Sequence, residues 1–298
     1  MEAKSLKFKV LFCIFTCLLQ ADASVFSYEE ALVKYDENNL KMPEPESDGR
    51  IQTLNKKGAV TAKFDYATIE FLKFAQGKVV LEIGGTYGKV MITALRQSKS
   101  TQYTLNDLDP RHLFIAAKIL QSKVNENKLK PNSAQQVKFI RADVTNAQNI
   151  KNFGATYDAI FVGRVLHFLT PDQLEDAVKH LFLLLKPGGR IFVVAITPYV
   201  KRFEKFILEY ERRINAKEEN PGFVKSLHEY VNPEVTAPEQ IKNISIEPFF
   251  FLDDKALRAV FERNDFRVIE CKMIPLSYKS KSWELDGREN VILIAEKP

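Results

Sequence analysis

The sequence predicts an α/β protein with a seven-stranded, mostly parallel sheet and helices on both faces. From residue 78 onward, short apolar runs alternate with helical patterns, which is typical of a parallel sheet with crossover helices. Two apolar runs near the C-terminus, residues 266–274 and 291–296, predict an antiparallel closing pair. The composition, 45% hydrophobic and 27% charged over 298 residues, excludes a disordered or fibrous protein. The net charge of +5 comes without a long basic run, so it does not indicate a dedicated nucleic-acid binder.

The first 23 residues are predicted to be a secretory signal peptide. Three lysines precede the apolar run at residues 10–19, and Ala21-Asp22-Ala23 is a small-x-small cleavage site. Ten apolar residues rise only about 15 Å as a helix, about half the hydrocarbon core of a bilayer, which disfavours a stable membrane span. A buried N-terminal helix is the alternative. We therefore expect an exported protein, periplasmic or secreted, with delivery to another cell as one route.

Cleavage after Ala23 would leave Cys271 as the sole cysteine. A single thiol suits an oxidising compartment because it has nothing to mispair with. The histidines are scattered and form no cluster at ligand spacing, so we expect no metal site.

Residues 24–77 are predicted to form a helical arm in front of the sheet. The segment is polar and is interrupted at residues 42–49 by a loop rich in proline, glycine and acids. Apolar side chains at Ile69, Phe71 and Leu72 predict a short helix over residues 65–74 that closes with Gly77. The first strand of the sheet is expected directly after this helix.

Residues 78–298 are predicted to form the sheet domain. Its first five strands are expected at residues 79–83, 102–106, 137–141, 157–162 and 190–195. Before the fifth strand, Thr170 and Gln173 form a capping box, Pro171 starts the helix, and the Pro-Gly-Gly of residues 187–189 stops it. A helix over residues 253–264 precedes the closing pair. Between them, residues 197–252 carry an apolar helical face and are expected to be a helical lid insertion.

Chemically useful residues follow the first four strands, where open α/β sheets bind ligands. Glu82 ends the first strand and is followed by a glycine-rich turn with Gly84, Gly85 and Gly88. Asp107 comes about 20 residues later, the spacing at which a carboxylate meets ribose hydroxyls. A dinucleotide loop fails because Thr86 and Lys89 stand where it needs glycine, and a phosphate-binding loop fails because Val90 follows Lys89. A nucleoside-containing ligand is therefore indicated.

These residues together resemble the class I S-adenosylmethionine-dependent methyltransferases over residues 78–195 and, by strand order, to the C-terminus. The family pattern is an acid followed by glycines two, four and six positions later, and Thr86 replaces the middle glycine, for which Gly85 is the expected compensation. The resemblance implies a Rossmann-like fold and S-adenosyl-L-methionine as cofactor. It implies that Glu82, Gly84, Gly85 and Gly88 shape the methionine pocket, that Asp107 binds the ribose, that Asp143 and Val144 bind the adenine, and that Gly163 lies near the methionine amino end.

The expected reaction is in-line attack of an acceptor atom on the sulfonium methyl, for which positioning supplies much of the rate. His167 is the candidate general base because it follows the fourth strand at the rim of the site, and a packed or capping histidine is the alternative. The acceptor is unidentified, with a small molecule favoured over a protein.

Two other functions remain open at this point. A metal-dependent glycosyltransferase would use Asp107 and Asp109 as an acid pair, which would suit an exported protein. A non-catalytic binding module on the methyltransferase fold would explain Thr86 and the export signal together.

Overall fold

The computed structural model describes residues 23–46, 49–61, 63–98, 101–154, 156–242, 244 and 246–298. Residues 1–22 of the predicted signal peptide lie outside this part of the chain. Within it, every helix is too short or too polar to cross a membrane.

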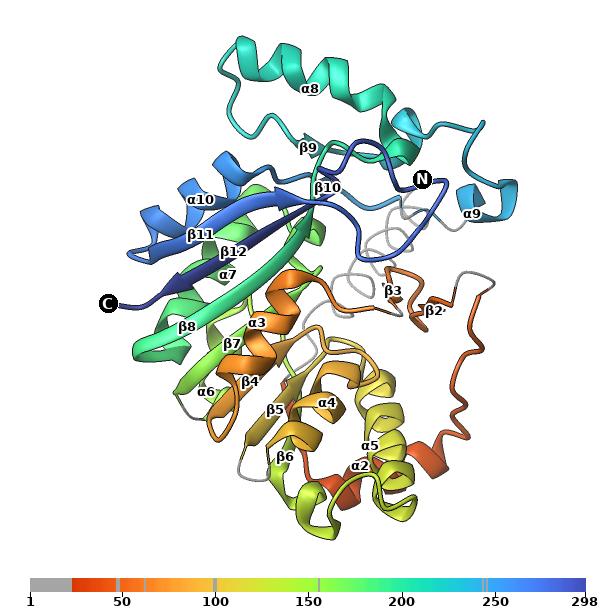
Figure 1. Cartoon of the computed structure of the whole chain (residues 1–298), viewed down its shortest axis with the longest axis vertical. Helices are drawn as coiled ribbons and strands as arrows, with labels where there is room; N and C mark the ends of the chain where they lie inside the picture. The colour runs from red at the N-terminus through yellow and green to blue at the C-terminus, as the bar shows by residue number, and fades with distance from the viewer. Residues whose placement is uncertain are drawn as a thin grey trace, which may run out of the picture.

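The described residues form one eight-stranded sheet in the order β1-β6-β5-β4-β7-β8-β12-β11 (Figure 1). The five central strands are parallel to one another, and β12 and β11 run antiparallel, as predicted. The seven predicted strands are present as β4 (Val79–Ile83), β5 (Gln102–Asn106), β6 (Val137–Arg141), β7 (Tyr157–Gly163), β8 (Leu185–Ile196), β11 (Arg267–Ile274) and β12 (Asn290–Glu296).

The count of seven strands is wrong because the chain contributes an eighth, β1 (Ser24–Phe26), at the far edge. It pairs antiparallel with β6, and α2 (Tyr28–Glu37) follows it and packs along α5. The residues after the predicted cleavage site are therefore part of the main sheet, so the segment predicted to be a helical arm begins with a strand.

Helices cover both faces of the sheet, in agreement with the prediction. One face buries the apolar sides of α3 (Tyr66–Phe74), α4 (Lys89–Gln97) and α5 (Pro110–Asn125). The other buries α6 (Ala147–Phe153), α7 (Pro171–Leu184) and α10 (Asp254–Arg263). Alternate residues of the central strands enter the two cores, as Val80 and Leu81 do, because successive side chains of a strand point to opposite faces.

The predicted lid segment is a separate small layer at the carboxyl end of β8. It contains η3 (Lys201–Phe203), α8 (Lys205–Asn215), β9 (Phe223–Val224), η4 (Leu227–Tyr230), α9 (Pro238–Lys242) and β10 (Phe249–Phe250). Side chains of this segment, among them Phe203, Phe206 and Tyr210, belong to a third apolar core of the molecule. Figure 1 shows α8 at the top of the molecule. Ile214, near the end of α8, lies outside this core and is 40% exposed. The β9–β10 pair makes the segment more than the expected helical insertion.

The strand order indicates where a ligand site would lie. β5 and β6 lie on one side of β4, whereas β7 and β8 lie on the other, so the order reverses between β4 and β7. Open α/β sheets bind ligands at such a reversal, beyond the carboxyl ends of the strands. The loops after β4, β5, β6 and β7 are therefore the place to look for a site.

Candidate cofactor site

The turn after β4 alternates between ordinary and left-handed backbone. Gly84, Thr86 and Gly88 have φ angles of +69°, +50° and +70°. Glycine tolerates this region, but a β-branched residue does so only under strain. The three left-handed positions coincide with the three glycine positions of the family pattern. The turn therefore keeps the expected backbone path, with Thr86 carrying the conformation itself and donating its hydroxyl to the Gly84 carbonyl at 3.1 Å.

The expectation that Gly85 compensates for Thr86 is wrong, because Gly85 does not take the left-handed conformation. Gly85 matters because the packing around it leaves no room for a side chain. A Cβ atom there would lie 2.2 Å from Leu105 Cδ1 and 2.9 Å from Glu82 Cδ. The glycine lets the turn pack directly on β5 and on the side chain of Glu82.

Glu82 is buried beneath the turn. Its carboxyl accepts a 2.7 Å hydrogen bond from the Tyr103 hydroxyl and a bond from the Met91 backbone in the first turn of α4. Burial raises the pKa of Glu82 to about 8, with the Tyr103 bond opposing the shift and the Asp107 charge adding to it. Glu82 therefore holds its proton at neutral pH and links β4, β5 and the start of α4.

The raised pKa gives Glu82 a measurable effect on stability. Between about pH 5 and 8 the folded protein holds a proton at Glu82 that the unfolded chain has released, so raising the pH favours unfolding. The free energy of unfolding of the wild type, relative to Glu82→Gln, should fall by about 1.4 kcal/mol per pH unit in this window and level off above it. Chemical denaturation of both proteins across this range measures the difference. Parallel curves for the two proteins would contradict the assignment.

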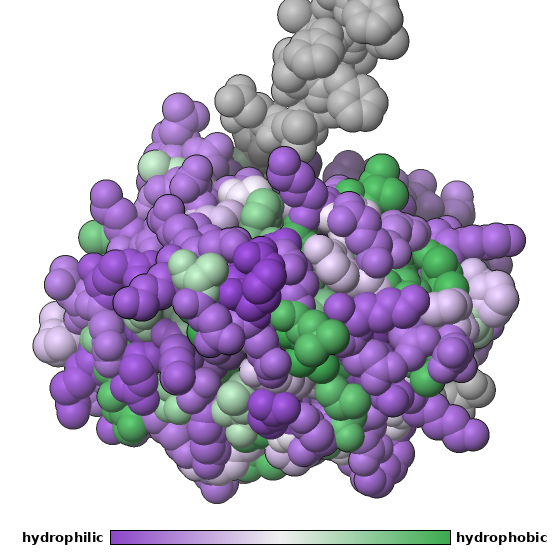
Figure 2. All heavy atoms as spheres, turned by 90° about the horizontal axis from the view of Figure 1, so that it is seen from above, coloured by the Kyte–Doolittle hydropathy of each residue, from purple (hydrophilic) through white to green (hydrophobic). Residues whose placement is uncertain are grey.

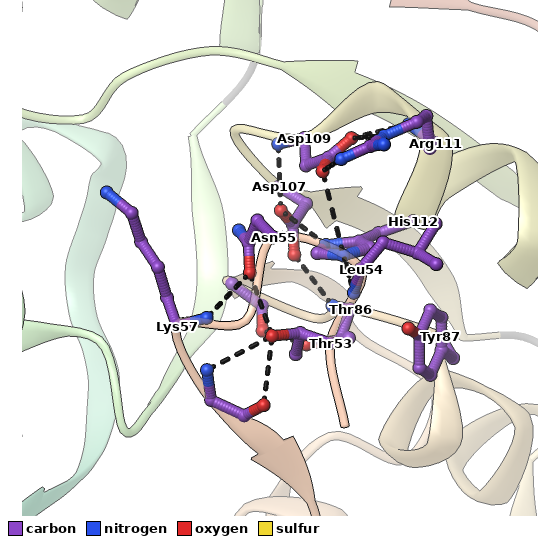
Figure 3. Close-up of polar contacts among 12 residues, drawn as sticks. Thr53, Leu54, Asn55, Lys57, Thr86, Tyr87, Asp107, Asp109, Arg111 and His112 are labelled. Atoms are coloured by element: carbon purple, nitrogen blue, oxygen red, sulfur yellow. Dashed lines mark hydrogen bonds and ion pairs between the residues drawn. The ribbon is translucent and has the colours of Figure 1, made fainter. Parts of the chain in front are cut away.

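Asp107 follows β5 and is 7% exposed. Its Oδ2 accepts from the backbone N–H of Thr86 at 3.0 Å, and its Oδ1 accepts from the backbone N–H of Asp109 at 3.0 Å. Oδ1 also lies 3.0 Å from Nδ1 of His112 (Figure 3). The carboxylate is thereby fixed between the turn after β4 and the start of α5, where a ribose-binding acid is expected.

Asp109 is held differently from Asp107. It caps α5 and pairs with the Arg111 guanidinium at 2.5 Å. The carboxylates of Asp107 and Asp109 thus both contact nitrogen donors of the chain itself. This arrangement gives no support to a metal ion shared between the two residues.

Sequence reasoning missed His112 and the hairpin that lies against it. The hairpin consists of β2 (Ile51–Gln52), β3 (Ala59–Val60) and the turn between them. The Leu54 N–H lies 3.1 Å from His112 Nε2, and the Tyr87 hydroxyl donates to the Gln52 carbonyl at 3.0 Å. Figure 3 shows Leu54 and Asn55 beside Asp107 and Thr86. The position of His112 in the first turn after an Asp-x-Asp-Pro sequence was the one available signal.

Asp143 and Val144 follow β6 as predicted. Asp143 Oδ1 accepts from both the backbone N–H and the hydroxyl of Thr145, at 2.9 and 2.8 Å, which leaves Oδ2 outside these two bonds. The Val144 side chain is buried in the core beneath the sheet, and its carbonyl lies 2.8 Å from Nδ1 of His180. These bonds fix the loop at the carboxyl end of β6.

Gly163 ends β7, next to the strand that leads into the glycine-rich turn. The following residue, Arg164, has φ of +59° and bonds Asp65 through Nη1 at 3.0 Å. Val165 then covers the turn, since a Cβ on Gly84 would lie 2.2 Å from Val165 Cγ2. The structure thus brings Gly84 and Gly163 to adjoining strand ends.

The prediction that His167 lies at the rim of the site is wrong, because the residue is only 1% exposed. Its ring lies 4.4 Å from that of Phe168 and 4.9 Å from that of Phe249, measured between centroids. Burial, together with the charge of Arg164, lowers the pKa of His167 to about 3. General bases work best with a pKa near the working pH, so this environment favours the alternative of a packed histidine.

The His167→Phe variant should therefore keep most of the activity. A phenyl ring fits the aromatic surroundings, and we expect kcat to change by less than about threefold, compared with the 10²–10⁴-fold that general acid–base catalysis contributes. Steady-state kinetics from pH 6 to 9 on both proteins measure this. A loss of about 100-fold with an altered pH profile would instead establish His167 as the base.

Comparison with known proteins agrees with this geometry. The family model described as a methyltransferase domain matches residues 81–191. Phosphoethanolamine N-methyltransferase 3 of Arabidopsis thaliana is 31% identical over 124 residues, 42% of this chain and 22% of that protein. Residues 81–191 therefore carry a methyltransferase domain. The chain spans only about a fifth of the length of this curated relative.

Solved structures share the fold of the methyltransferase domain. An S-adenosylmethionine-dependent methyltransferase from Methanosarcina mazei superposes with a TM-score of 0.53 at 15% identity, over 79% of this chain and 98% of that chain. A possible exported protein from Bordetella parapertussis gives 0.51 at 14% identity, over 78% and 66%. The hairpin at residues 51–60 and the lid at residues 197–252 lie outside the range that the methyltransferase family model matches.

Proposed function

We propose that the protein is an S-adenosylmethionine-dependent methyltransferase that modifies a small polar molecule. The observation that carries the proposal is the bond between the Thr86 N–H and Asp107 Oδ2, which joins the left-handed turn after β4 to the acid after β5. The bond supports the proposal because it holds the turn beside the carboxylate, as one cofactor bound through its amino acid part and its ribose would require.

The predicted cofactor-binding residues other than Glu82 would then each have a role in holding the cofactor. Asp107 would accept from the ribose hydroxyls, Asp143 Oδ2 from the adenine amino group, and the turn from Gly84 to Gly88 would lie along the methionine part, with Gly163 at its amino end. Val144 would support the adenine loop from the core. When bound, the cofactor would supply a sulfonium methyl group that an acceptor nucleophile attacks in line. The chain contributes mainly position and exclusion of water.

Unpaired polar atoms support a small acceptor. Arg164 Nη2 and Asn290 Nδ2 are buried and have no hydrogen-bond partner in the described part of the chain. Arg164 follows β7, and Asn290 pairs with Ile196 at the end of β8, so both lie toward the carboxyl edge beside the lid. Buried donors of this kind are costly unless a ligand satisfies them. They favour an acceptor with several oxygen atoms.

One face of the molecule gives a second reason to favour a small molecule over a protein. On the face seen from above in Figure 2, apolar residues lie in separate patches among hydrophilic side chains. Protein-binding surfaces usually offer a larger contiguous apolar area. The acceptor is therefore expected to enter a site between the lid and the strand ends.

A methyl-transfer assay tests the function and the acceptor class together. The protein is incubated with S-adenosylmethionine labelled in its methyl group and a cell extract, and the label is followed into low-molecular-weight and protein fractions. Label in the small-molecule fraction, absent with Asp107→Ala, is the expected result. Label in proteins alone would overturn the acceptor class, and no label in either fraction would favour the non-catalytic binding module.

We also propose that the protein is exported by a cleavable signal peptide. β1 begins at Ser24, the first residue after the predicted cleavage site, so cleavage would leave the whole described sheet in place. The similarity to a possible exported protein is in line with this. N-terminal sequencing of the protein from its native host should read Ser24 first in the exported fraction. Uncleaved, full-length protein in the cytosol would contradict export.

A further inference from the structure

His112 connects two parts of the molecule that are far apart in the sequence. It lies in the first turn of α5, is 1% exposed, and its ring meets that of Tyr87 edge-on at 5.3 Å. One ring nitrogen, Nδ1, is 3.0 Å from Asp107 Oδ1, and the other, Nε2, is 3.1 Å from the backbone nitrogen of Leu54 (Figure 3). The imidazole therefore bridges the carboxylate of the proposed ribose site and the hairpin at residues 51–60.

The partner on each side fixes the tautomer of the ring. The Leu54 N–H can only donate, so Nε2 must be the accepting, unprotonated nitrogen. In the neutral ring the proton then resides on Nδ1, which donates it to Asp107 Oδ1. His112 thus orients the carboxylate with one nitrogen and holds the hairpin with the other.

The hairpin depends on such contacts for its position. β2 and β3 pair only with each other among the described strands, and an isolated two-stranded hairpin is marginally stable in water. Within its turn, Thr53 bonds Gly58 through both backbone and hydroxyl. Its contacts with the cofactor side are the Leu54 bond to His112 and the Gln52 bond to Tyr87, which belongs to the turn after β4.

We propose that His112 is a positioning residue that couples closure of the hairpin to cofactor binding. This inference rests on the proposed function. A closed hairpin holds the ring in place, the ring holds Asp107 in the orientation that the ribose hydroxyls need, and a bound ribose holds Asp107 in return. Because coupling between two sites is reciprocal, cofactor binding must stabilise the closed hairpin by the same factor by which the closed hairpin strengthens binding.

Two variants of His112 separate its two bonds. The amide nitrogen of Asn lies close to where Nδ1 was, so His112→Asn can still donate to Asp107 but loses the Leu54 contact. The amide oxygen of Gln reaches the position of Nε2, so His112→Gln can still accept from Leu54 but loses the donation to Asp107. Tyr87→Phe is the matched variant that removes the Gln52 bond and touches neither Asp107 nor His112's hydrogen bonds.

Hydrogen exchange of the full chain, with and without S-adenosylhomocysteine, tests the coupling. In the wild type the product should slow exchange at the Leu54 amide. In His112→Asn that slowing should vanish, whereas in His112→Gln the amide should stay protected although affinity falls. Each His112 variant should bind S-adenosylhomocysteine about five- to tenfold more weakly, the factor expected for one net hydrogen bond.

Tyr87→Phe decides the matter even if the His112 variants do not fold. It should speed exchange at Leu54 and weaken S-adenosylhomocysteine binding about two- to fivefold. Faster exchange with unchanged affinity would show that the hairpin is not coupled to the site and would overturn the inference. Wild-type protein that binds the product without any change at Leu54 would also overturn it, whereas no binding by the wild type would count against the proposed function itself.

Discussion

The Asp107→Ala variant is expected to bind S-adenosylhomocysteine about 100-fold more weakly than the wild type, or worse. A hydrogen bond to a charged group contributes about 1.5–3 kcal/mol, and the ribose offers two hydroxyls to this carboxylate. The loss also strands the Thr86 N–H, the Asp109 N–H and His112 Nδ1, which all lie within 3.0 Å of Asp107. Equilibrium dialysis with labelled product measures the change.

Asp109→Asn is the matched control for Asp107→Ala. Asparagine can still cap α5, so the variant should fold and bind the product as tightly as the wild type, within about twofold. A glycosyltransferase that holds a metal between the two acids would lose activity with either substitution. Equal damage from both variants would therefore contradict the assignment of Asp107 alone to the ribose.

The Gly85→Ala variant should destabilise the protein by about 2–3 kcal/mol. The added Cβ would come within 2.2 Å of Leu105 Cδ1 and within 2.9 Å of Glu82 Cδ, and neither buried side chain can move away freely. Overpacking a filled core costs about 1–3 kcal/mol, and here the turn that forms the cofactor site must shift as well. Product binding should fall together with stability.

Gly58→Ala in the hairpin provides the comparison for Gly85→Ala. A Cβ there would meet nothing within 4 Å, and the residue has no left-handed φ. Its free energy of unfolding should stay within about 0.5 kcal/mol of the wild type, as for an ordinary surface change. Thermal and denaturant unfolding of the three proteins measure both effects. A Gly85→Ala protein as stable as Gly58→Ala would show that the turn can relax away from β5.

The central sheet could be predicted from the sequence because its strands contain short apolar runs, such as residues 159–162 of β7 and 191–196 of β8, which are buried on both faces. β1 could not, since its three residues carry no such run and Val25 is 45% exposed. Its pairing with β6 joins residues more than 100 positions apart. A short edge strand of this kind is determined by tertiary pairing and leaves little local signal.

The candidate site could be predicted where it depends on local spacing, but not where it depends on long-range contacts. Strand ends and glycine positions located Glu82, the turn from Gly84 to Gly88, and Asp107. The tie between His112 and Leu54 joins positions 58 apart and has no pattern in the sequence. His167 was predicted at the rim because it closely follows a strand in the sequence. That position gives no information about Phe249 of the lid, whose ring packs against His167 and helps to bury it.

Calorimetric titration of residues 24–298 with S-adenosylhomocysteine is the most direct test of the cofactor site. We expect saturable binding at one site per chain, with S-adenosylmethionine competing for it. A folded protein that gives no heat with either compound would contradict the cofactor site. Heat that appears only with a nucleotide sugar and a divalent metal would replace methyl transfer with glycosyl transfer as the function of this crevice.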